Sequence, residues 1–133
     1  MKAQENSPAG VPALFDLRGQ AVLVTGAASG LGLAMAEAML DAGANLLMSD
    51  IDGDMLSAQV ERLRSRARGA LHAQVADVAD TAQVEALVDA VLQRHGALDV
   101  AFANAGVSAG RGFVAEQGRL QNIDDAAWER VLR

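Results

Sequence analysis

Short apolar runs alternate along the chain with longer segments in which apolar residues recur every three or four positions. The runs are rich in alanine, valine and leucine, which is typical of parallel strands covered on both faces. The three-and-four spacing predicts helices that lay one face against a sheet. We expect strands at 21–25, 45–49, 71–75 and 98–103, helices at 31–42, 53–67 and 80–95, and a last helix from 126.

The same spacing predicts which side chains of each helix face the core. In the first helix they are Leu31, Met35, Ala38, Met39 and Ala42. In the second they are Met55, Val60 and Leu63, and in the third Val84, Leu87, Val88, Val91 and Leu92. Gly43 suits the left-handed position that ends a helix, and Asp80 or Thr81, with Gln83 closing a capping box, starts the third.

Strands that alternate with helices in this way are joined by right-handed crossovers, which require a parallel sheet. The first strand runs into a glycine-rich turn at 25–32, TGAASGLG, and then into the first helix. Glycines lack the Cβ atoms that would hold a ligand's phosphates off the backbone, and a helix N-terminus points unpaired N–H groups at an anion. The order strand, glycine turn and helix predicts a dinucleotide site; the alternative is a turn with no ligand.

The glycine turn resembles the T-G-x-x-x-G-x-G cofactor motif of the short-chain dehydrogenase/reductase family. The resemblance extends to Asp50 at the end of the second strand, Asp77-Val78 after the third, Asn104-Ala-Gly106 after the fourth, and Trp128 in the last helix. It implies a Rossmann-type α/β fold, a parallel sheet in the order 3-2-1-4 with helices on both faces, truncated after the fourth strand and the start of the next helix.

The resemblance also implies a set of residues that hold the dinucleotide. They are Gly26, Ser29, Gly30, Leu31, Gly32, Asp50, Ile51, Asp77, Val78, Asn104, Ala105 and Gly106. Asp77 and Val78 frame the adenine in the family, although a carboxylate after a strand is otherwise a common turn residue. Asn104 braces neighbouring strands, so its contact with the ligand is the less direct part of its role.

Asp50 decides which dinucleotide is expected. A carboxylate at the end of the second strand can accept both hydrogens of the adenosine ribose diol, and it repels a 2′-phosphate. Ser29 and Ile51 stand where NADP-preferring relatives carry arginine or lysine. We therefore expect NAD in preference to NADP, with the capping of the next turn as the alternative role of Asp50.

The family's catalytic groups are a serine, a tyrosine and a lysine four residues after the tyrosine. This sequence has no tyrosine, and its only lysine is Lys2. We assign no catalytic residue and expect the chain alone to be inactive, as the cofactor-binding half of an oxidoreductase that moves a hydride between nicotinamide and an alcohol or carbonyl substrate. The alternative is a non-catalytic nucleotide-binding module or an inactive fragment. A methyltransferase on a similar sheet is disfavoured by the glycine spacing.

Composition and charge argue against several classes of binding partner. The net charge of −6 argues against nucleic acid and anionic membrane, and the arginines at 62, 64, 66 and 68 are expected in a solvated helix end. The chain has no cysteine and no apolar run long enough to span a bilayer, so we expect a cytoplasmic protein. His72 has no partner at metal-ligand spacing, so no metal site is expected.

The predicted organisation is a loose arm at 1–13 followed by a binding half-domain at 14–133. The loop 107–122 could cover a substrate. Arg111 could meet an acidic substrate group, but a solvated loop arginine is the favoured interpretation. Trp128 is interpreted as a packing residue. A full-length family member is expected to be a homo-oligomer.

Overall fold

The structure is a computed structural model and describes residues 15–108 and 122–132. Its centre is a parallel sheet in the order β3-β2-β1-β4, formed by β1 (Ala21–Thr25), β2 (Asn45–Asp50), β3 (Leu71–Val75) and β4 (Val100–Phe102). The predicted order and parallel sense are confirmed. The fourth strand is shorter than predicted. The predicted arm at 1–13 and most of the loop at 107–122, including Arg111, lie outside the described residues.

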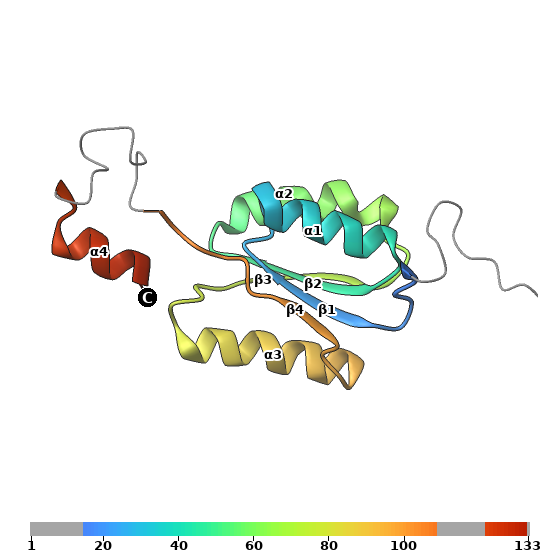
Figure 1. The fold of residues 1–133 in the computed structure, drawn as a ribbon. Coiled ribbons are helices and arrows are strands. Elements are labelled where there is room, and N and C mark those ends of the chain that lie inside the picture. Colours follow the sequence, from blue (N-terminus) through green and yellow to red (C-terminus); the bar gives the residue numbers. More distant parts are fainter. Residues whose placement is uncertain (1–14, 109–121, 133) are drawn as a thin grey trace, which may run out of the picture.

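Helices cover both faces of the sheet, as Figure 1 shows. The helices α1 (Gly30–Asp41) and α2 (Gly53–Leu63) lie on one face, and α3 (Thr81–His95) lies on the other. A 3-10 turn, η2 (Arg64–Arg66), continues α2, so the helix predicted at 53–67 ends earlier. The last helix, α4 (Asp125–Leu132), lies beyond the carboxyl ends of the strands.

Alternate residues of the central strands face the two helical layers. Val22 and Val24 of β1 belong to the larger core cluster under α1 and α2, whereas Leu23 belongs to the smaller cluster under α3. Every residue of β1 is buried, as expected of a strand covered on both faces. The sheet is therefore a rigid platform, and its carboxyl edge positions the loops that follow each strand.

The predicted inner face of α1 is only partly correct: three of its five residues lie against or in the core, and the helix is rotated from the predicted orientation. Its buried residues are Gly32, Ala36 and Leu40, while Leu31 is 73% exposed and Ala38 is exposed. Met35 and Met39 are half-buried, and only Ala42 is buried as predicted. The cause is steric, because α1 meets the turn before it at Gly32, and that contact fixes which side of the helix faces the sheet.

Smaller errors of the same kind occur in the other helices. In α2, Leu56 is buried with Val60 and Leu63, whereas Met55 is exposed. In α3, Leu87, Ala90 and Val91 are buried, Val84 and Val88 are half-buried, and Leu92 is exposed. The wrongly placed residues each lie one position from a buried one.

Helix ends follow the predicted chemistry with one difference. Gly43 has a φ of +92° after α1. Asp80 is the N-cap of α3 and accepts from the Ala82 N–H at 3.0 Å. Gln83 does not close a capping box on Asp80, because its Oε1 accepts from the Asp77 N–H, while its Nε2 donates to the Asp80 carboxylate.

The arginine cluster joins two helices. Arg62 and Arg66 both pair with Glu37 of α1, and Arg66 also reaches Asp41 at 2.7 Å. The Arg62 guanidinium beside Glu37 lowers the pKa of that carboxyl. The predicted solvated helix end is thus only partly correct, since these arginines are exposed but also link α2 and η2 to α1.

His72 of β3 has a neighbour that its sequence context did not reveal. Its ring lies 6.0 Å from the ring of His95 at the end of α3, measured between centroids. Burial lowers the pKa of His72 from its ordinary value of 6.5, and the charges of Arg94 and His95 lower it further. The two histidines and one arginine therefore disfavour an added proton here.

We expect the chain to lose stability as the pH falls below about 6.5. Because the pKa of His72 is lower in the folded chain, the unfolded chain takes up this proton first, and folding is penalised below the ordinary value. Urea midpoints measured from pH 7.5 to pH 5.5 should show this slope, and His72→Gln should flatten it. A His72→Gln slope equal to that of the wild type would contradict this account.

Candidate functional site

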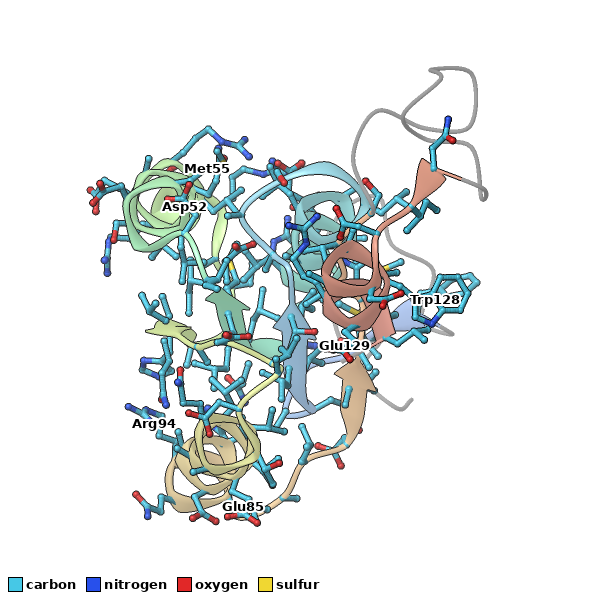
Figure 2. The ribbon with its side chains drawn as sticks, turned by 90° about the vertical axis from the view of Figure 1, so that its left-hand side faces the viewer. Asp52, Met55, Glu85, Arg94, Trp128 and Glu129 are labelled. Atoms are coloured by element: carbon cyan, nitrogen blue, oxygen red, sulfur yellow. The ribbon has the colours of Figure 1, made fainter. Side chains whose placement is uncertain are left out.

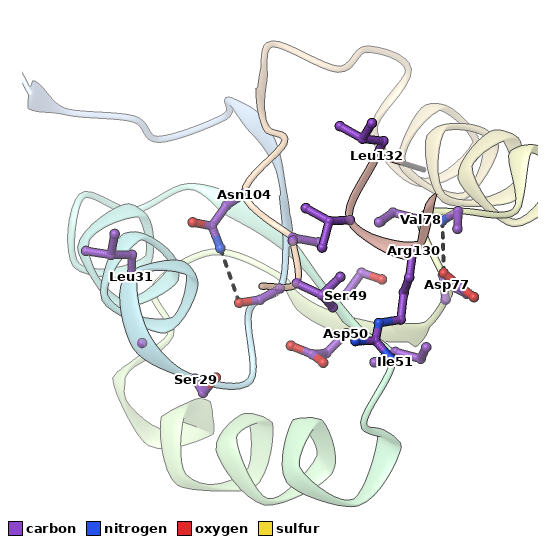
Figure 3. A pocket seen from close by; sticks show the side chains of 18 residues that line it. Ser29, Leu31, Ser49, Asp50, Ile51, Asp77, Val78, Asn104, Arg130 and Leu132 are labelled. Atoms are coloured by element: carbon purple, nitrogen blue, oxygen red, sulfur yellow. Dashed lines mark hydrogen bonds between the residues drawn. The ribbon is translucent and has the colours of Figure 1, made fainter. Parts of the chain in front are cut away.

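A cleft of about 950 Å³ opens at the carboxyl ends of the strands. Eleven of the twelve predicted ligand residues line it, and Gly32 does not. Figure 3 shows the cleft between the glycine turn, the ends of β2 and β3, and α4. Lining residues that the sequence analysis missed are Ser49, Ala76, Ala79, Val107, Arg130, Val131 and Leu132. Their contact with a dinucleotide, like that of the predicted residues, stays a prediction.

The glycines of the turn have different steric tasks. A Cβ on Gly32 would lie 2.0 Å from the Gly26 carbonyl oxygen, and one on Gly26 would lie 2.9 Å from the Ala105 Cα. Gly30 has a φ of +54° and open space in front of it. The expectation that glycines make room for phosphates therefore fits Gly30, whereas Gly26 and Gly32 allow the turn, α1 and the β4 loop to approach closely.

The N-terminus of α1 is open towards the cleft. Its N-cap, Ser29, makes no side-chain cap hydrogen bond, and the first turn contains no acidic residue. Ser29, Gly30 and Leu31 all line the cleft. The first-turn N–H groups and the positive end of the helix dipole can therefore act on an anion held there.

Asp50 ties the end of β2 to the glycine turn. Its Oδ2 accepts from the Ala28 N–H at 3.0 Å, and its Oδ1 accepts from the Asp52 N–H at 3.1 Å. Each carboxylate oxygen keeps a further acceptor site, and the residue is half-exposed at the cleft. The two roles weighed for Asp50 are thus compatible, because it caps the next turn and also presents a charge to the cleft.

Apolar side chains border the cleft where β2 and β3 end. Ile51 and Val78 are both exposed, and Figure 3 shows them with Asp77 on the side of the cleft away from Leu31. Asp77 is also a turn residue, since its Oδ1 accepts from the Ala79 N–H at 2.9 Å. A flat aromatic ring between Ile51 and Val78 would remove apolar surface of these two side chains from water.

Asn104 and Thr25 fasten the β4 loop to the glycine turn. The Asn104 Nδ2 donates to the carbonyl oxygens of Thr25 and Gly26, at 3.2 and 3.4 Å. The Thr25 hydroxyl donates to the Phe102 carbonyl at 3.2 Å and accepts from the Ala105 N–H at 3.1 Å. The expected bracing role of Asn104 is confirmed, and Thr25 shares it.

Thr25→Val should lower the free energy of unfolding by about 1–3 kcal/mol, because it keeps the side-chain shape but leaves the half-buried Phe102 carbonyl and Ala105 N–H without their partner. Urea denaturation measures this change. Thr81→Val, at an exposed position of α3, is the matched control and should change stability by less than about 0.5 kcal/mol. Equal effects of the two variants would show that the Thr25 hydrogen bonds contribute nothing.

Comparison with known proteins agrees with this geometry. The family model described as short chain dehydrogenase matches residues 20–133. The chain belongs to the short chain dehydrogenase family. A dehydrogenase of Streptomyces avermitilis, which acts on 1-deoxy-11-beta-hydroxypentalenate by its name, is 46% identical over 92 residues. That match covers 68% of this chain and 33% of the relative.

Solved structures of short chain dehydrogenases match as well. A family member from Burkholderia phymatum in complex with NAD superposes with a TM-score of 0.76 at 34% identity, covering 87% of this chain and 38% of that one. A metagenomic oxidoreductase in complex with NADP gives 0.74 at 28% identity, covering 88% and 50%. The family thus uses NAD(P), and this chain spans a third to a half of the length of these three proteins.

The last helix of the chain, α4, borders the cleft. Arg130, Val131 and Leu132 line it, and Figure 3 shows the Arg130 side chain reaching towards Asp50 and Ile51. The predicted packing role of Trp128 is wrong here, because its side chain is 51% exposed and α4 has no buried residue. Figure 2 shows Trp128 pointing outward from the helix.

The described part of the chain contains neither a metal-binding cluster nor a membrane-spanning helix. No group of three or more histidine, cysteine, aspartate or glutamate side chains there could hold a metal ion. None of the described helices has the length and apolar character needed to cross a bilayer.

Proposed function

We propose that this chain is the dinucleotide-binding half of a short-chain dehydrogenase-type oxidoreductase and that it prefers NAD to NADP. The observation that carries the proposal is the Asp50 carboxylate, which is joined to the glycine turn and faces the same cleft as the open N-terminus of α1. When bound, NAD supplies the hydride acceptor for oxidation of an alcohol, and NADH the donor for the reverse reaction. The chain's own residues bind and orient it.

The pyrophosphate would lie at the start of α1. Gly30 leaves open space there, and a Cβ at this position would project into it. The uncapped N–H groups and the helix dipole favour a doubly charged group at this point. This fit of backbone donors to phosphate supports the proposal without any basic side chain in the turn.

The adenosine end would lie towards β2 and β3. The Asp50 carboxylate offers its remaining acceptor sites to the two ribose hydroxyls, and a 2′-phosphate at the same place would meet its negative charge. Ile51 and Val78 would cover the adenine, with Asp77 at the ring edge. The NAD preference rests on Asp50 in this proposal.

Hydride transfer needs a group that gives or takes the alcohol proton. No tyrosine is available in this sequence, and Lys2 is its only lysine. We therefore propose that these 133 residues bind the dinucleotide without turning over an alcohol or carbonyl substrate unless the missing groups are supplied.

Titration with NADH and NADPH, followed by nicotinamide fluorescence, tests the proposal. We expect saturable binding with NADH bound at least about 10-fold more tightly, since hydrogen bonds to a charged group contribute about 1.5–3 kcal/mol. Equal or tighter NADPH binding would overturn the NAD preference. Failure of both to bind would overturn the dinucleotide site itself.

A further inference from the structure

Ser49 carries a buried hydroxyl that forms no hydrogen bond with any residue the structure describes. The residue lies near the end of β2 and is fully buried. Its backbone carbonyl accepts from the Ala27 N–H at 2.9 Å, so its backbone is held against the glycine turn while its side chain is unpaired. Buried polar groups in proteins nearly always have a partner, so this exception requires a physical reason.

The neighbouring strand provides a contrast. Thr25 pairs with Ser49 in the register of β1 and β2, and its hydroxyl both donates and accepts a hydrogen bond. The Thr25 hydroxyl therefore serves the fold, whereas that of Ser49 serves no contact within the described residues. An alanine at position 49 would fill nearly the same volume without a buried unpaired hydroxyl.

Ser49 lines the cleft. It directly precedes Asp50, and Ala76 and Asp77, which follow the adjacent strand β3, line the same cleft. Figure 3 shows Ser49 among the lining side chains, close to Asp50. Rotation about one bond turns a serine hydroxyl, which can act as either donor or acceptor. The residue that carries the unpaired group thus lies at the end of β2, next in sequence to the carboxylate proposed for the ribose, and lines the same cleft as Ala76 and Asp77.

We propose that the Ser49 hydroxyl hydrogen-bonds the adenine end of a bound dinucleotide. This inference rests on the proposed function and adds a second polar group, beside Asp77, to a base site bordered by Ile51 and Val78. Adenine carries ring nitrogens that accept and an amino group that donates, so the hydroxyl can pair with either. Ser49 then contributes to the choice of adenine at this end of the cleft.

The test compares the wild-type chain with Ser49→Ala by calorimetric titration with AMP, NAD and nicotinamide mononucleotide. We expect Ser49→Ala to weaken AMP and NAD binding by about 3- to 10-fold and to leave nicotinamide mononucleotide binding unchanged. The melting temperature of the ligand-free variant should rise, because an unpaired buried hydroxyl is removed. Ser57→Ala, at an exposed serine of α2, is the matched control for binding and should leave the affinity for all three ligands unchanged.

The outcomes separate this inference from the proposed function. Wild-type binding of NADH together with equal AMP affinity in both chains would overturn the role of Ser49 and leave the dinucleotide site standing. A lower melting temperature with weaker binding of both mononucleotides would assign Ser49 to packing and also overturn it. Absence of AMP and NADH binding in the wild type would overturn both proposals.

Discussion

Replacing Gly32 with alanine is expected to lower the free energy of unfolding by about 3 kcal/mol or more and to abolish dinucleotide binding. The new Cβ would lie 2.0 Å from the Gly26 carbonyl oxygen and 2.6 Å from the Asn104 Nδ2. The nearer atom belongs to the backbone and cannot turn aside. The start of α1 would have to move off the turn, and the N–H groups that face the cleft would move with it.

The sign of this effect is informative. Alanine is more favourable than glycine within a helix by about 1 kcal/mol, so helix propensity alone predicts a more stable variant. Gly96→Ala is the matched control, because Gly96 has a φ of +76° and a Cβ added there would meet nothing within 4 Å. It should cost about 1–2 kcal/mol and leave NADH affinity unchanged. Urea denaturation and NADH titration measure both variants, and a Gly32→Ala chain as stable as the wild type would contradict the steric argument.

The strands could be predicted from the sequence because their signal is local. The strands at 21–25 and 71–75 were predicted with the observed bounds. The strand β2 is one residue longer than the predicted 45–49, because it includes Asp50. The first two runs are mainly apolar and end at a polar residue or before a glycine, so their limits lie in the pattern itself. The strand order followed from the family resemblance and is confirmed.

The rotation of α1 could not be predicted in the same way. Alanine, methionine and leucine occur on every side of this helix, so periodicity does not select one face. The contact between Gly32 and the Gly26 carbonyl does select it, and it turns Leu31 outward. A steric contact between two backbone segments produces no hydrophobic pattern in the sequence, so the sequence does not predict the orientation of α1.

The cleft was predictable where its residues follow a strand, because parallel strands bring their carboxyl ends to one edge. Ser49 had a usable signal, as a polar residue at the end of the apolar run of β2. Arg130 had none, since the position of α4 relative to the cleft depends on the chain between β4 and α4 and not on the helix pattern. The residues that follow the strands are therefore placed in the cleft by the topology of the sheet, whereas those of α4 are placed there by tertiary packing.

Asp50→Asn should shift the ratio of NADH to NADPH affinity by about 10-fold or more towards NADPH. Asparagine keeps one side-chain oxygen, which can still accept from the Ala28 N–H and hold the glycine turn, whereas its NH2 group cannot accept from the Asp52 N–H. It removes the charge that, in the proposed function, would bind the ribose diol and repel a 2′-phosphate. Alanine at this position would be less informative, because it would also leave the N–H groups of Ala28 and Asp52 without their acceptor.

Fluorescence titration of both dinucleotides measures the shift, and urea denaturation should show stability within about 1 kcal/mol of the wild type. Asp89→Asn, at an exposed carboxylate of α3, removes the same charge from the chain and is the matched control. It should leave the ratio unchanged, because screening by salt weakens interactions over more than about 10 Å. A shift of equal size in the two variants would assign the preference to net charge, and no shift in Asp50→Asn would remove Asp50 as its source.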